Sequence, residues 1–168
     1  DLRSVAMRRL ETQLDRLEAT HRSVIAAAYD NLAGTQQINR AILKVMEPND
    51  FGSFLEMTER DMPDIMKIDF ASLILETTQQ EPDPTLAHLS SVLIPAPTGF
   101  IDKYLSSRAG KIGTKVTLRA VTSPSALVYD SAPCSIGSEA CLRLEFGAET
   151  VSGLLILGAN DPNQFSPA

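Results

Sequence analysis

The residues best suited to chemistry are two cysteines, two histidines and several aspartates, and they are scattered along the chain. Cys134 and Cys141 are separated by six residues, a spacing that matches neither a zinc site nor a redox motif. Catalysis would need a nucleophile with its base, paired carboxylates or metal ligands within hydrogen-bonding reach. We therefore expect both cysteines to be reduced thiols that pack in the core, and we expect no catalytic residues.

The histidines and aspartates offer little more. His21 falls on a regular apolar stripe, where a polar residue sets the register of paired helices. His88 follows two prolines in a polar segment and is expected to be solvated. Asp61, Asp64 and Asp69 resemble a set of metal ligands, but a proline and a change of secondary structure separate them. We expect a solvated acidic surface, with no metal site and no cofactor.

Sequence motifs and overall charge narrow the classes of partner. No dinucleotide, P-loop, zinc-protease or EF-hand motif occurs, and the basic segment 106–111 lacks the strand-to-helix context of a phosphate loop. The 168 residues carry a formal net charge of −6, which argues against a role that depends on neutralising phosphates. We therefore expect neither nucleic acid nor a membrane as a partner.

Two arginines and one tyrosine are better placed for binding than for catalysis. Arg119 and Arg143 each leave the apolar face of an alternating strand for the opposite face, and Tyr104 lies on a short amphipathic helix. Arginine can bind a carboxylate or a phosphate through two parallel hydrogen bonds. The competing interpretation is that both arginines pair with Glu139, Glu145 or other acids of the sheet surface.

A long amphipathic helix opens the chain. Its apolar stripe alternates spacings of three and four residues, which is typical of a coiled coil. The stripe consists of Met7, Leu10, Leu14, Leu17, His21, Val24 and Ala28. Because too little chain lies beside this helix to bury the stripe within one copy, we expect a homodimer built on it. The alternative is that the helix folds back onto its own domain.

The chain is expected to divide into this helix, over residues 1–46, and a globular domain over residues 47–168. Gly34 is expected to loosen or break the helix locally, and Pro48 to end it. The globular part is expected to begin with a helix capped by Asn49 or Asp50 and stopped at Pro63, followed by a strand over 68–76 and a polar connection over 79–91. A helix over 99–107, a half-buried strand over 115–122 and a turn with a short helix over 123–130 are expected next. An antiparallel hairpin of strands 139–146 and 153–158 is expected to end the domain. This order predicts an α+β fold.

The last third of the chain resembles the end of a GAF domain. After a strand over 138–144 and a turn, residues 153–167 read Gly-Leu-Leu-x-Leu-Gly-x-x-Asp-Pro-x-x-Phe-x-Pro. This pattern resembles in particular a bacterial GAF-like family catalogued as domain of unknown function 484. The resemblance implies a central antiparallel sheet with helices on one face and a pocket on the other. It also implies a further helix after Pro167, which is expected to be missing from this chain.

These observations predict a non-catalytic GAF-like module that senses a small molecule or binds a protein partner. In that interpretation Arg119 and Arg143 orient an anionic ligand, Tyr104 is a lid contact, and the N-terminal helix makes the homodimer. The alternatives are a thiol-dependent redox enzyme related to GAF proteins and a purely structural dimer scaffold. Because no signal peptide and no membrane span are apparent, we expect the protein to be cytoplasmic.

Overall fold

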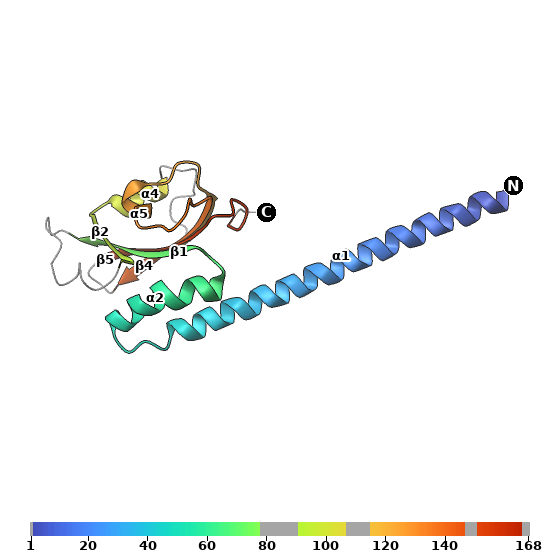
Figure 1. The fold of residues 1–168 in the computed structure, drawn as a ribbon. Helices are drawn as coiled ribbons and strands as arrows, with labels where there is room; N and C mark the ends of the chain where they lie inside the picture. Colours follow the sequence, from blue (N-terminus) through green and yellow to red (C-terminus); the bar gives the residue numbers. More distant parts are fainter. Residues whose placement is uncertain (1, 78–90, 107–114, 147–150, 166–168) are drawn as a thin grey trace. The chain divides into compact units, whose positions relative to one another are not determined.

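The computed structural model describes residues 2–77, 91–106, 115–146 and 151–165 (Figure 1). The chain forms two compact units, Asp1–Arg40 and Ala41–Ala168. Helix α1 spans Leu2–Val45, so its last residues belong to the second unit, where Ala41 is buried in the same apolar cluster as Met57. We call this second unit the body.

Helix α1 is one uninterrupted helix of 44 residues. The expected break at Gly34 was wrong, because a single glycine costs a helix only about 1 kcal/mol and the residues around it favour helix. The helix ends at Val45, ahead of Pro48 as expected. In the described part of the chain, no helix combines the length and the apolar character that crossing a membrane requires.

Helix α2 spans Phe51–Met66 and begins at the expected cap. Asp50 accepts a hydrogen bond from the backbone N–H of Ser53 at 2.9 Å, and this bond lowers the pKa of the Asp50 carboxyl. The expected stop at Pro63 was wrong, because the helix continues for another turn. It ends at Lys67, whose left-handed φ of 55° turns the chain toward the sheet.

The sheet has five strands in the order β2-β1-β5-β4-β3. Their bounds are Phe70–Thr77 for β1, Leu93–Pro97 for β2, Val116–Ala120 for β3, Ser138–Phe146 for β4 and Val151–Ala159 for β5. The hairpin of β4 and β5 is antiparallel as expected, and β1 also pairs antiparallel with β5. The α+β class is therefore confirmed.

One strand makes the sheet mixed rather than antiparallel. Strand β2 pairs parallel with β1, with Leu73 opposite Leu93. No strand was expected there, and Pro95 and Pro97 lack the N–H that a central strand needs. Among the described strands β2 is an edge, with β1 as its neighbour, and an edge strand tolerates proline.

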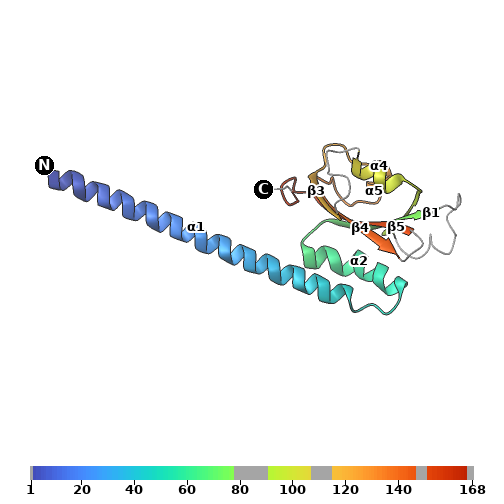
Figure 2. The same ribbon diagram turned by 180° about the vertical axis from the view of Figure 1, so that it is seen from behind.

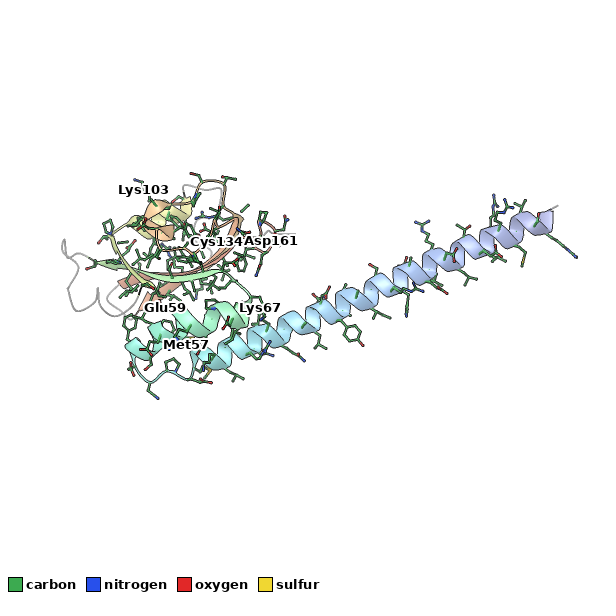
Figure 3. All side chains as sticks on the ribbon, viewed as in Figure 1. Met57, Glu59, Lys67, Lys103, Cys134 and Asp161 are labelled. Atoms are coloured by element: carbon green, nitrogen blue, oxygen red, sulfur yellow. The ribbon has the colours of Figure 1, made fainter. Side chains whose placement is uncertain are left out.

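Helices cover both faces of this sheet, whereas the resemblance implied helices on one face. Helix α2 packs on one face, and α4 (Phe100–Ser106) and α5 (Ala126–Tyr129) pack on the other (Figures 1 and 2). Figure 3 places Met57 and Glu59 on α2 and Lys103 on α4, at opposite sides of the sheet. Each face has its own apolar core, with Leu73 and Leu157 toward α2 and Ile74 and Ile156 toward α4 and α5.

The closing motif ties the end of β5 to the start of β1. The backbone N–H of Asn160 donates to Asp69 at 2.7 Å, and the side-chain amide of Gln164 donates to the Lys67 carbonyl at 2.9 Å. A Cβ at Gly137 would overlap the Asn160 carbonyl oxygen, which explains the glycine there. Residues of the motif therefore have a structural role in closing the sheet.

Candidate functional site

Alternation along β3 and β4 brings a buried ion pair to the face beneath α4 and α5. In the antiparallel register Arg119 of β3 lies directly opposite Glu139 of β4. Both side chains are buried, and Glu139 has no exposed surface at all. The Arg119 Nε donates to Glu139 Oε1 at 2.6 Å. A buried charge persists only when it is paired and hydrogen-bonded, so each residue requires the other.

Two tyrosines complete the bonding of this carboxylate. The Tyr104 hydroxyl on α4 donates to Glu139 Oε2 at 2.7 Å, and the Tyr129 hydroxyl on α5 donates to the same oxygen. Arg119 also donates to the Tyr104 carbonyl at 3.3 Å, and its guanidinium carbon lies 4.9 Å from the centre of the Tyr104 ring. We call these four residues the Glu139 cluster.

The electrostatics of the cluster keep its tyrosines protonated. Burial raises the pKa of Tyr104, and the nearby charge of Glu139 raises it further. Burial is also the largest cause of the raised pKa of Tyr129, followed by the charges of Tyr104 and Glu139. For Arg119, burial alone would lower the pKa, but the hydrogen bond and charge of Glu139 raise it. At neutral pH both tyrosines are therefore protonated, and each hydroxyl can donate its hydrogen bond to Glu139.

Arg143 has a different environment from Arg119. Its Nη2 donates to Asp102 on α4, whose side chain is 70% exposed. Its Nε is buried and has no hydrogen-bond partner in the described part of the chain. Arg143 therefore retains one buried donor that could bind an anion.

The structure thus brings together two of the three expected ligand-binding residues. Tyr104 and Arg119 are in contact, while Arg143 is bonded to Asp102 and not to the Glu139 cluster. Arg119 pairs with Glu139, one of the acids that the competing interpretation named, whereas Arg143 pairs with Asp102 of helix α4 and not with an acid of the sheet. Tyr129 was missed, because nothing in its local sequence shows that α5 reaches the same carboxylate as α4.

The alternation of β3 was expected, but its burial is the reverse of what alternation suggests. Val116 and Leu118, on one face of the strand, are exposed, whereas Arg119, on the other face, is buried. Strand β3 is an edge of the sheet, and α2 packs on β1 rather than over β3. The side of β3 that α2 leaves uncovered is therefore its apolar side.

The candidate residues for metal and thiol chemistry lie apart. Cys141 is buried in the core, and Cys134 is half-buried with a pKa raised by burial and by the charge of Asp69. Asp61 pairs with Lys44, and His88 lies outside the described residues. In the ranges that the structure describes, no three His, Cys, Asp or Glu side chains are grouped as metal ligands would be.

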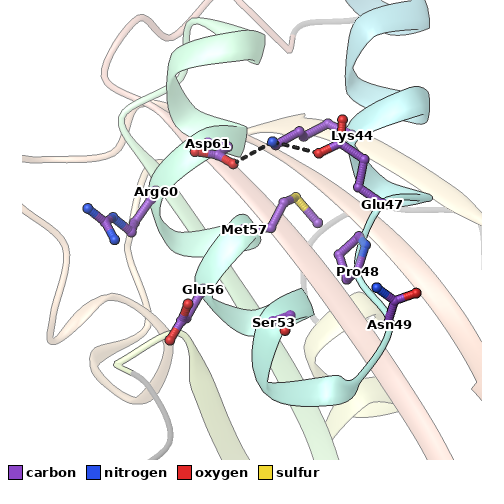
Figure 4. A pocket seen from close by; sticks show the side chains of 9 residues that line it. All are labelled: Lys44, Glu47, Pro48, Asn49, Ser53, Glu56, Met57, Arg60 and Asp61. Carbon is purple, nitrogen blue, oxygen red and sulfur yellow. Dashed lines mark hydrogen bonds and ion pairs between the residues drawn. The ribbon is translucent and has the colours of Figure 1, made fainter.

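A second candidate is an open groove of about 370 Å³ at the turn between α1 and α2 (Figure 4). It is lined by Lys44, Glu47, Pro48, Asn49, Ser53, Glu56, Met57, Arg60 and Asp61. The Lys44 ammonium lies 2.7 Å from Glu47 Oε2 and 3.2 Å from Asp61 Oδ2, and these bonds raise the pKa of Lys44. Because these partners are exposed, the groove holds a solvated ion-pair network rather than a site with activated groups.

Each residue of the expected dimer stripe is exposed on α1 in the single chain. Met7, Leu10, Leu14, Leu17 and Val24 are large apolar side chains, and Leu17 is 67% exposed. The two remaining residues of the stripe, His21 and Ala28, are also exposed. Glu18 and Arg22, four residues apart on the same helix, form an ion pair at 3.5 Å.

Neither a protein-family model nor a curated protein matches the sequence. The resemblance to GAF domains therefore stays a prediction from the closing motif.

The Glu139 cluster leads to a prediction about stability. We expect Glu139→Gln to lower the free energy of unfolding by about 3–5 kcal/mol, because the Arg119 charge stays buried without its counter-charge. Asp102→Asn is the matched control, since it breaks the exposed pair with Arg143 and costs less than about 1 kcal/mol. Urea unfolding measures both. Equal losses for the two variants would show that the cluster has no special role.

The two tyrosines predict a loss of stability at alkaline pH. Their folded-state pKa values lie above the ordinary tyrosine value of about 10, so their contribution is complete below about pH 10. It is lost as the pH rises toward the folded-state values. We expect unfolding free energies measured from about pH 8 to about pH 11 to decline less steeply for Tyr129→Phe than for the wild type. Parallel curves for the two proteins would contradict this assignment.

Proposed function

We propose that this chain is a non-catalytic module that self-associates through α1 and uses its body to recognise a small molecule or a protein partner. The observation that carries the proposal is the row of exposed apolar side chains along α1. Monomeric proteins rarely expose a contiguous apolar surface of this kind, and such surfaces mark interaction sites.

Self-association accounts for the spacing as well as the exposure of the row. Apolar residues that alternate by three and four along a helix pack as knobs into the holes of a facing helix. A second copy presents the same stripe, so a two-fold symmetric pair buries the stripes of both copies against each other. The polar outer positions, which include the Glu18–Arg22 pair, remain in water.

The recognition role of the body is supported by Arg143 and by the resemblance to GAF domains. The buried Nε of Arg143 lacks a partner among the described residues, and Nη2 is held by an exposed aspartate. A carboxylate or phosphate that displaced Asp102 could bind both nitrogens at once. GAF domains are sensory modules, so the resemblance favours a small anionic molecule as the ligand.

The thiol-dependent enzyme is less well supported. Thiol chemistry requires a thiolate, and the raised pKa of Cys134 favours the protonated form at neutral pH. Cys141 is almost completely buried, packed in the core beneath α4 and α5. A reactive thiol is exposed as well as ionised, and Cys141 is not exposed.

Substitution within the stripe tests self-association. We expect Leu14→Glu with Leu17→Glu to raise the dissociation constant of the dimer at least about a hundredfold, because two carboxylates would be buried in each half of the interface. Ala19→Glu, on the outward side of the same turns, should leave the dimer intact. Light scattering at micromolar concentration measures the mass of each. A wild-type chain that is monomeric under these conditions would contradict the proposal.

A ligand screen tests the recognition role. We expect a carboxylate- or phosphate-bearing compound from a set of nucleotides, amino acids and organic acids to raise the melting temperature of the wild type. Arg143→Gln should abolish the shift, while Arg60→Gln, on the opposite side of the sheet, should retain it. If no compound in the set shifts the wild type, the body is a structural scaffold. A shift that survives Arg143→Gln places the ligand elsewhere.

A further inference from the structure

We propose that the two copies pair antiparallel through α1, with His21 of one copy facing Asn31 of the other. This inference rests on the proposed self-association and adds its direction and register. It concerns the residues of α1 in the first unit, Asp1–Arg40.

The stripe of α1 continues beyond Ala28 with the same spacing. The next three positions are Asn31, Thr35 and Ile38, all on the uninterrupted helix, and Ile38 is 52% exposed. The full stripe therefore contains polar residues at 21, 31 and 35. Because a polar residue in a helix seam needs a polar partner, these positions restrict which register is favourable.

The stripe consists of two alternating kinds of position, the a and d positions of the heptad. In an antiparallel pair each a position of one helix faces a d position of the other. With the symmetry axis level with residue 26, the facing layers are Leu14 with Ile38, Leu17 with Thr35, His21 with Asn31, and Val24 with Ala28. The imidazole and the amide each offer a donor and an acceptor, so this layer can satisfy itself. A shift of one heptad toward the N-terminus would place Asn31 against Leu14 and His21 against Val24. A shift the other way would place His21 against Ile38.

Side-chain volumes favour the same register over a parallel pair. In a parallel, in-register pair each residue faces itself, so Ala28 would face Ala28 and leave a thin layer. The two imidazoles of His21 would also meet, and they would repel when both are protonated. The antiparallel register instead pairs Ala28 with the larger Val24, so the side-chain volume differs less from one layer to the next. Its one mismatch is Leu17 with Thr35, where the threonine methyl still offers apolar surface.

The flanking positions also fit this register. Ile25, which is exposed beside the stripe, meets Ile25 of the other copy near the symmetry axis. On the other flank Ala27 meets Ala27, and Gly34, which has open space around it, lies level with Thr20. No like charges oppose each other at these positions.

Cysteine cross-linking distinguishes the two directions. Leu17→Cys and Thr35→Cys are prepared separately, one of them labelled with ¹⁵N, and are oxidised alone and as a mixture. In the antiparallel register two copies of residue 17 lie about 27 Å apart along the helix axis, so neither variant links to itself. The mixture should give one labelled and one unlabelled chain joined through residues 17 and 35, located by peptide mass. The unsubstituted chain is the control for Cys134 and Cys141.

The outcomes separate this inference from the proposal on which it rests. Efficient self-linking of Leu17→Cys, with a dimeric mass in light scattering, would overturn the antiparallel register and leave the dimer intact. A monomeric mass for the unsubstituted chain would overturn both. Linkage only in the mixture, at residues 17 and 35, supports the register.

Discussion

The body depends on how one buried carboxylate is satisfied. Glu139 lies near the start of β4 with no exposed surface, and an edge strand and two helices all supply donors to it. Strand β3 contributes Arg119, α4 contributes Tyr104 and α5 contributes Tyr129. The residue opposite Glu139 on β5 is Gly158, over which Ile136 packs closely. Since both short helices are bonded to one carboxylate, their positions on the sheet are linked.

This arrangement also explains why the two arginines differ although both were expected to bind a ligand. Arg119 occupies the register position opposite the acid, so its charge is used within the fold. Arg143 lies four residues farther along β4, next to the first turn of α4, and its partner there is an exposed side chain. A buried pair resists exchange because breaking it exposes an uncompensated charge, whereas an exposed partner is readily replaced.

Much of this fold follows from local patterns, and the parts that do not follow depend on distant contacts. Local sequence determines three of these features, so they were predictable: the stripe of α1, the cap at Asp50, and the hairpin of β4 and β5. Strand β2 was not, because only its place at the edge makes Pro95 acceptable. The partner of Arg119 was among the acids considered, but Tyr129 reaches it only through the packing of α5.

The position of β5 in the sheet has a consequence for how the body is made. In the described sheet β5 is the central strand, paired with β1 on one side and β4 on the other, yet it comes after the other four described strands in sequence order. During synthesis β1 therefore emerges long before the strand that joins it to β4. Until β5 arrives, the two halves of the sheet have unpaired edges that can associate with other chains. The sheet of the body is consequently complete only once β5 has emerged, and truncation before residue 151 would remove the strand that joins its halves.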